Sequence, residues 1–267
     1  MKRYLILLFF SIASNLDLKA QKFKDNLDHK IIYKLTYVLD STNFEKPESE
    51  FMILYTGDEL SLFTSRAKSL ANPIVVRGNS GHTSRSAVSQ FQYELIKNRE
   101  KNKIYYTQNI AGDWFLYEQN IDLFEWKISA DTKSIKGYEC QKATTSFKGR
   151  NYTAWFAPEI PISEGPYKFN GLPGLILEIA DSEEEWNFQF VSLENLNPSK
   201  KYKINFAQYI NTSEEKLMDV WKTYRSDPFG YVDNPNVKIS PEIHKKYIEA
   251  FGKMLENENN PLELENE

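Results

Sequence analysis

Side chains that could act as nucleophiles, bases or metal ligands are few and widely spaced. The three histidines, His29, His82 and His244, form neither an HExxH nor an HxH arrangement, so their spacing predicts no metal site. Ser80 lies close to His82, but residues 78–82 (GNSGH) lack the GxSxG pattern of a nucleophile elbow. We therefore expect no metal and no catalytic residue, and keep a hydrolase that uses Ser80 and His82 as a minor alternative.

Cys140 is the only cysteine, which excludes an intrachain disulfide, a CxxC redox pair and a cysteine-based zinc site. A thiol becomes a nucleophile when a neighbouring cation or base lowers its pKa. The sequence assigns no such neighbour to Cys140, so we expect a buried, inert thiol and treat it as the second minor hydrolase candidate. The sequence has no glycine-rich phosphate loop, so we predict no cofactor and expect a protein that is not an enzyme.

The most informative segment is residues 158–174, called the strap below, which holds four of the eleven prolines. It ends in residues 172–175 (LPGL), which have the composition of a type II turn with a positive φ at Gly174. Long connections without secondary structure are uncommon in compact domains and are often functional. Tyr167 and Phe169 lie on the strap and are candidate ligand or partner contacts. The alternative is a rigid strap that covers one end of the sheet and fixes its register.

Arg150 and Trp155 complete the candidate ligand- or partner-binding residues. Both lie at the predicted strand that leads into the strap. Because side chains alternate between the two faces of a strand, we expect one of them to be buried and the other to make a charged contact.

Alternating apolar residues predict a mainly β fold from residue 29 to about residue 206. Trp186, Phe188 and Phe190, for example, alternate with Asn187 and Gln189. Tight turns separate these segments, so we predict an antiparallel meander that forms a barrel or half-barrel-like sheet. Further strands are predicted at 33–39, 50–56, 59–64, 91–95, 102–109, 113–119, 124–130, 135–147, 151–157 and 175–180.

Two C-terminal α-helices are predicted after residue 210, where the apolar period changes. The first spans about 213–225 and begins at a serine cap followed by two glutamates. The second spans about 240–256 and has Pro241 at its first helical position. Residues 66–87 fit no strand pattern, and we predict one short helix and a flexible loop there.

Residues 1–20 have the order of a secretory signal peptide: a basic start, an apolar run over 4–13 and a small residue, Ala20. The run is too short to span a bilayer. We therefore predict a signal peptide over 1–20 and one β-rich domain over 21–267, exported to the periplasm or cell surface and not membrane-spanning. A formal net charge of −4 without a basic block argues against a nucleic-acid-binding protein.

The end of the strap resembles the motif that names the GLPGLI family, a family of exported proteins from Gram-negative bacteria. The motif consists of Gly171, Leu172, Pro173, Gly174, Leu175 and Ile176. Other blocks are similar to that family's blocks in the same order, namely 137–143, 149–156, 159–162, 165–166 and 260–264. The resemblance implies a β-rich periplasmic or surface protein without an established activity or agreed catalytic residues. It also implies an envelope setting, with an outer-membrane transporter or other envelope protein as partner.

Together these patterns predict a non-enzymatic binding or accessory protein of the cell envelope, for an apolar or peptidic ligand or for a transport system. A lipid-like or peptide ligand would lie on a concave, ring-lined sheet, as in half-barrels that carry lipid-like cargo. This comparison is an analogy of fold alone. The alternative is a structural or docking module of an outer-membrane complex without a small ligand. The sequence predicts no oligomeric state.

Overall fold

The computed structural model describes residues 22–71, 89–232 and 240–264, and every structural statement below concerns these residues. The predicted signal peptide lies outside them, as do Ser80 and His82. The short helix expected in the 66–87 excursion is present as α2 (Arg66–Ala71).

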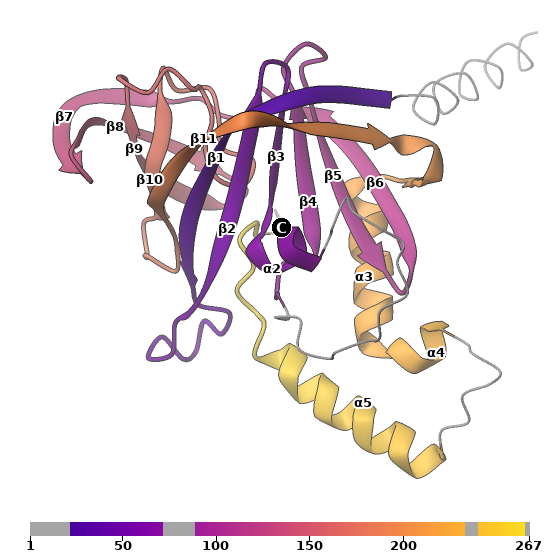
Figure 1. The fold of residues 1–267 in the computed structure, drawn as a ribbon. Helices are drawn as coiled ribbons and strands as arrows, with labels where there is room; N and C mark the ends of the chain where they lie inside the picture. Colours follow the sequence, from indigo (N-terminus) through magenta and orange to yellow (C-terminus); the bar gives the residue numbers. More distant parts are fainter. Residues whose placement is uncertain (1–21, 72–88, 233–239, 265–267) are drawn as a thin grey trace, which may run out of the picture.

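A single open sheet of 12 strands forms the body of the protein (Figure 1). The strand order is β12-β6-β5-β4-β3-β2-β1-β11-β10-β9-β8-β7, so β12 and β7 lie at opposite edges and the sheet does not close. The predicted mainly β, half-barrel-like fold is confirmed. In chain order the strands are β1 (Lys22–Tyr37), β2 (Glu48–Gly57), β3 (Leu60–Ser65), β4 (Tyr93–Asn98), β5 (Lys103–Ile110), β6 (Asp113–Asn120), β7 (Lys127–Ile135), β8 (Tyr138–Phe147), β9 (Arg150–Ala157), β10 (Leu175–Asp181), β11 (Trp186–Asn205) and β12 (Ile210–Asn211).

The strands form two meanders instead of the single one that we predicted. β1 to β6 follow one another in space, and β7 to β11 do the same. The first and last long strands join the two halves, because β1 pairs with β11 from Lys22↔Asn205 to Tyr37↔Trp186. Alternation of apolar residues identifies a strand but not its distant partner, so the sequence pattern could not show this pairing.

Three of the hairpins turn through two consecutive residues with positive φ, at 111–112, 136–137 and 148–149. The second residue of each pair is glycine. Two positive φ values characterise type I′ turns, whose twist matches that of the flanking strands. These local turns set the register of neighbouring strands in both meanders.

Both faces of the sheet carry apolar clusters. The inner face is covered by the strap and is rich in rings, among them Tyr33, Phe156 and Phe169. The outer face of β2–β6 is covered by residues 22–27 of β1 and 200–205 of β11, called the β1–β11 arm below, which crosses above these strands in Figure 1.

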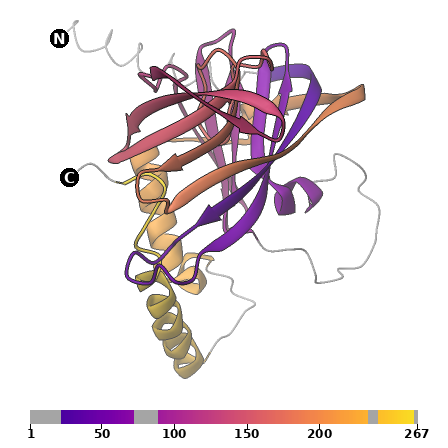
Figure 2. The same ribbon diagram turned by 90° about the vertical axis from the view of Figure 1, so that its left-hand side faces the viewer.

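Three helices follow the sheet: α3 (Glu214–Ser226), α4 (Pro228–Val232) and α5 (Pro241–Glu256). The two predicted helices are therefore present, with Ser213 and Ser240 as their N-caps. α3 packs beside β6, whereas α5 buries none of its residues and projects away from the sheet (Figures 1 and 2). No helix in the described ranges is long and apolar enough to cross a membrane.

The GLPGLI residues turn the chain from the strap into β10. Gly174 has the predicted positive φ, at +154°. The hydrogen bond of the turn runs from the Gly174 N–H to the Leu172 carbonyl at 2.8 Å, which makes a three-residue γ-turn instead of the predicted type II turn. The tighter turn allows Leu175 to pair with Ala157 at the start of β10. A Cβ on Gly174 would lie 2.2 Å from the Ala157 carbonyl oxygen.

Gly174→Ala should therefore lower the free energy of unfolding by about 2 kcal/mol or more, from backbone strain and the backbone clash together. Urea unfolding followed by circular dichroism measures this loss. Gly112→Ala is the matched control, because Gly112 also has a positive φ but no atom lies within 4 Å of its added Cβ. Equal losses in the two variants would show that the close approach at Gly174 contributes nothing.

Candidate functional site

The strap lies on the inner face of the sheet as a folded loop with its own hydrogen bonds. The Ser163 hydroxyl donates to the Leu172 carbonyl at 2.8 Å, and Glu164 pairs with Asn170 in an isolated antiparallel bridge. The Ile176 N–H donates to the Glu164 carbonyl at 3.0 Å, which ties the strap to β10. The strap therefore has a defined shape and places its charged side chains in fixed positions.

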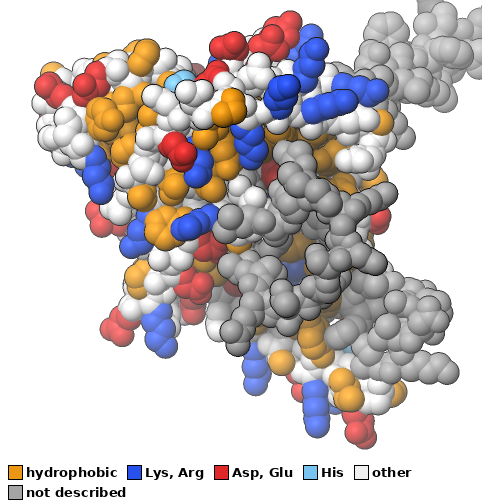
Figure 3. Space-filling model, viewed as in Figure 1, with side chains coloured by type: hydrophobic (Ala, Val, Ile, Leu, Met, Phe, Trp, Pro, Cys, Tyr) orange, Lys and Arg blue, Asp and Glu red, His pale blue; other side chains and the backbone are white. Residues whose placement is uncertain are grey.

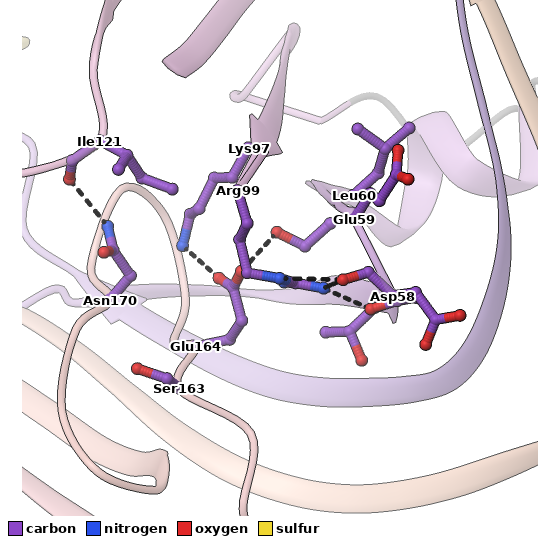
Figure 4. Close-up of polar contacts among 12 residues, drawn as sticks. Asp58, Glu59, Leu60, Lys97, Arg99, Ile121, Ser163, Glu164 and Asn170 are labelled. Atoms are coloured by element: carbon purple, nitrogen blue, oxygen red, sulfur yellow. Dashed lines mark hydrogen bonds and ion pairs between the residues drawn. The ribbon is translucent and has the colours of Figure 1, made fainter. Parts of the chain in front are cut away.

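Glu164 is the first of these charged side chains and is almost fully buried (Figure 4). Its carboxylate accepts a hydrogen bond from Ser61 at 2.9 Å and pairs with Lys97 at 2.9 Å. Arg99 pairs with the same carboxylate at 2.8 Å. These partners come from β3, β4 and the turn after β4, so one strap residue joins three neighbouring parts of the sheet.

Lys97 is itself fully buried and points from β4 toward the strap. Besides Glu164, its ammonium group donates to the carbonyls of Phe169 at 2.7 Å and Gly165 at 3.3 Å. Burial lowers the pKa of Lys97, and the attraction of Glu164 opposes that shift. The three contacts match the three donors of an ammonium group, so this network is satisfied and acts as an anchor for the strap.

Lys168, also fully buried, is the centre of a second polar group on the strap. Its ammonium group pairs with Glu263 at 2.6 Å and with Glu214 at 3.5 Å, and contacts the Tyr117 hydroxyl at 3.3 Å. Four aromatic rings surround it at 5.4–6.0 Å, which is the range of cation–π contacts. The rings are those of Tyr106, Tyr117, Phe147 and Tyr167. These residues, with Glu214 and Glu263, are called the Lys168 cluster below.

Two groups of the Lys168 cluster, Tyr167 and Glu214, have shifted pKa values. Burial and then Glu263 raise the pKa of Tyr167 well above 10, so its hydroxyl stays a donor, and it donates to Glu263 at 2.6 Å. Burial alone would raise the pKa of Glu214, but Lys168 and Lys148 outweigh it and lower the pKa below 4.5. The cluster therefore presents an ammonium group and phenol donors to carboxylates.

Residues 260–264, called the C-terminal segment below, cross the inner face beside this cluster. Arg150 donates to the Pro261 carbonyl at 2.8 Å, and the Tyr152 hydroxyl donates to the Leu262 carbonyl at 3.0 Å. The Leu264 N–H donates to the Lys148 carbonyl at 3.0 Å. Side chains of β9 thus hold the main chain of this segment. Arg150 is fixed in turn by Asp181 at 2.6 Å, by Glu185 at 2.7 Å and by the Asn260 side chain.

The four residues that we predicted as contacts do not form one site. Arg150, Tyr167 and Phe169 are buried on the inner face. Trp155 is only half-buried, packs against the apolar cluster that contains Tyr167 and Phe169, and has the Lys133 ammonium group 4.5 Å from its ring centre. We expected one residue of Arg150 and Trp155 to be buried and the other to make a charged contact. Arg150 is buried and also makes the ion pairs, with Asp181 and Glu185. Whether any of the four contacts a ligand stays a prediction.

Cys140 lies on β8 and is fully buried. Burial raises the pKa of its thiol to about 11, so the thiol is protonated at neutral pH. It has the environment expected for an inert cysteine. Within the described ranges, no group of three or more histidine, cysteine, aspartate or glutamate residues could hold a metal ion.

The sequence reasoning missed the charged residues Lys97, Glu164 and Lys168. Lys97 carries a weak signal, since it follows Leu95 and Ile96 in a strand that is otherwise apolar at its centre. Glu164 and Lys168 stand in a proline-rich segment, where charged residues are usually taken as solvated. Only the three-dimensional contacts show that they are buried.

Breaking the buried Lys97–Glu164 ion pair should lower the free energy of unfolding far more than breaking a partly exposed ion pair. Lys97→Met leaves Glu164 buried with one cation fewer and should lower the unfolding free energy by about 3 kcal/mol in urea titrations. Lys97→Met combined with Glu164→Leu should cost less than the sum of the single losses. Lys133→Met, which breaks a partly exposed pair with Glu178, should cost about 1 kcal/mol or less. Equal losses for Lys97→Met and Lys133→Met would contradict the anchoring role.

Acid should destabilise the protein partly through Glu214. Its lowered pKa means that its stabilising contribution is complete above its ordinary value of 4.5 and is lost as the pH falls through the lower folded value. Thermal unfolding midpoints measured from pH 6 down to about 3 should therefore fall less steeply in Glu214→Gln than in the wild type. Glu215→Gln, at the exposed neighbouring position, is the control and should retain the wild-type slope.

Three comparisons relate the chain to known proteins. Residues 144–178 match the sequence profile of a family described as a protein of unknown function (Porph_ging). These residues run from β8 through the strap into β10, so the match includes the GLPGLI motif, although the name GLPGLI itself stays a prediction. No curated protein matches the chain.

Two solved structures of PNGF-II resemble the fold at 16% sequence identity. For the crystals in space group P21 the TM-score is 0.50, with 74% of this chain and 34% of that chain covered. For space group C2 the TM-score is 0.52, with 74% and 33% covered. The chain thus spans about a third of the length of PNGF-II, and the likeness shows that this curved-sheet fold also occurs within a longer protein.

Proposed function

We propose that the protein is an exported, non-enzymatic accessory protein of the cell envelope that binds an extended peptide on the inner face of its sheet. The observation that carries this proposal is the way the sheet and strap hold the C-terminal segment. In this proposal the C-terminal segment occupies the peptide-binding site of its own chain. A peptide from a partner would replace it and make the same contacts.

Main-chain contacts would provide affinity without strong dependence on sequence. Arg150 and Tyr152 donate to consecutive carbonyls, at Pro261 and Leu262, as in other modes of extended-peptide recognition. Two side chains would add specificity: Leu262 is buried in the apolar cluster, and Glu263 pairs with Lys168. The preferred ligand therefore has an apolar residue followed by an acidic one.

A peptide fits this face better than a large apolar cargo. The strap side chains Tyr167, Phe169 and Leu172 are at most 5% exposed and pack in the inner cluster, where a lipid-like ligand was expected. The polar groups beside them are donors placed for carbonyls and a carboxylate. Lipid chains would leave these donors unpaired at a cost in free energy.

A docking module without a ligand is the second candidate function. α5 exposes Ile243 by 61% and Met254 by 43%, and none of its residues is buried. Apolar side chains of this kind on a projecting helix suit contact with another protein. In this case the partner would be an envelope protein, such as an outer-membrane transporter, and the C-terminal segment would stay in place.

The peptide proposal is tested by cutting the C-terminal segment from the rest of the chain, so that it can leave the site. A protease recognition sequence inserted after Asn257 allows the segment to be cut from the folded protein. We expect the cut segment to stay bound during gel filtration and to be displaced by excess labelled peptide of residues 258–267. A peptide with Leu262→Asp and Glu263→Lys should compete at least tenfold less well, because it loses one apolar and one ionic contact.

The two candidate functions predict different results. If the cut protein keeps its circular dichroism spectrum but neither retains the segment nor binds the labelled peptide, peptide binding is wrong and docking through α5 is favoured. If the peptide with Leu262→Asp and Glu263→Lys displaced the cut segment as well as the unchanged peptide does, the proposed specificity would be wrong.

A further inference from the structure

The outer face of the β1–β11 arm carries a row of lysines. Lys22 and Lys24 on β1, and Lys201 and Lys203 on β11, are all exposed. Because side chains alternate along a strand, the residues between them, such as Tyr202, face the outer apolar cluster instead. Figure 3 shows Lys and Arg side chains gathered along the edge of the molecule where the arm lies in Figure 1.

The pairing within the arm brings like charges together. Lys24 lies directly opposite Lys203, while Lys22 lies opposite Asn205 and Lys201 lies opposite Asn26. No carboxylate belongs to this row, and in the described part of the chain none of the four lysines has an ion pair. Like charges directly opposite each other destabilise a strand pair. The Lys24–Lys203 pair therefore does not itself stabilise the arm, and the row concentrates positive charge in a protein whose net charge is −4.

The carboxylates of the same stretch of β1 are engaged elsewhere. Asp25 turns to the opposite face of the arm and accepts hydrogen bonds from the Glu59 and Leu60 N–H groups at 2.9 and 2.8 Å. Asp28, beyond the arm, accepts a hydrogen bond from the Ser199 hydroxyl. Among the residues that the structure describes, no carboxylate therefore pairs with the lysines of the row.

We propose that the outer face of the β1–β11 arm is an electrostatic contact surface for a bilayer rich in anionic lipid headgroups. The row consists of lysine and asparagine side chains on a two-stranded ribbon and contains no apolar or aromatic anchor. Protein partners draw most of their affinity from such anchors. Anionic bilayers, in contrast, attract a group of lysines through charge alone.

The expected strength follows from the number of lysines. Each lysine held near an anionic surface increases binding about fivefold, so four lysines give an increase of several hundredfold over an uncharged bilayer. Such binding is reversible and is screened by salt, since the Debye length falls from about 10 Å at 0.1 M to about 3 Å at 1 M. The surface would therefore hold the protein at a membrane loosely, without insertion.

Co-sedimentation of the whole protein with lipid vesicles tests the surface. Vesicles of phosphatidylcholine with about one-third phosphatidylglycerol should bind it at low salt, and pure phosphatidylcholine vesicles should not. Lys24→Glu should weaken binding about 25-fold, because it removes one positive charge and adds a negative one. The control Lys46→Glu makes the same charge change at an exposed position in the β1–β2 loop, away from the arm, and should weaken binding much less.

Two further measurements separate this proposal from its competitors. The urea midpoint of Lys24→Glu should equal or exceed that of the wild type, because the new carboxylate faces Lys203; a lower midpoint would assign Lys24 a structural role and overturn the proposal. Inorganic phosphate at matched ionic strength should not displace the vesicles, and displacement would indicate a site for free phosphate. Equal binding to both kinds of vesicle, or equal losses for Lys24→Glu and Lys46→Glu, would also overturn it.

Discussion

Burial of two lysines governs the architecture of the inner face. An ammonium group removed from water needs a carboxylate or several carbonyl acceptors nearby, because the uncompensated charge costs several kcal/mol. Lys97, on the sheet, obtains these partners from the strap, and Lys168, on the strap, obtains them from α3 and the C-terminal segment. The sheet, strap, helix and segment are therefore linked by a chain of buried charges.

This linkage has a consequence for the proposed peptide site. Glu263 of the C-terminal segment is 2.6 Å from Lys168, and the strap that carries Lys168 is fixed to the sheet through Glu164. If the segment left, Lys168 would lose its closest counter-charge while its aromatic surroundings remained. An empty site is thus unfavourable, and a ligand that brings its own carboxylate restores the balance. The contacts that hold the segment in this structure would thus also account for the proposed preference for an acidic peptide.

Local sequence patterns predicted most strands and helices of this fold. They could not predict how these elements pair with one another or which charged side chains are buried between them. Alternating residues such as those of 186–190 identified strands, and Ser240 with Pro241 identified the start of α5. The β1–β11 pairing joins residues more than 140 positions apart, and no local pattern specifies it. From its prolines the strap was predicted to be either a rigid cover of the sheet or a contact segment that uses Tyr167 and Phe169. Its buried charges, Glu164 and Lys168, were not predicted, because their burial depends on partners distant in sequence.

The pairing of β1 with β11 also separates the two proposed binding surfaces. Over one part of their length these strands build the inner face, where the Tyr33 hydroxyl donates to the carbonyl of Ile176 at the start of β10, just after the strap. Over the other part they leave the plane of the meanders as the arm, with one face on Tyr105 and Phe206 and the lysine row on the other. A membrane contact on the arm would therefore leave the inner face and its peptide site accessible, because the body of the sheet lies between them.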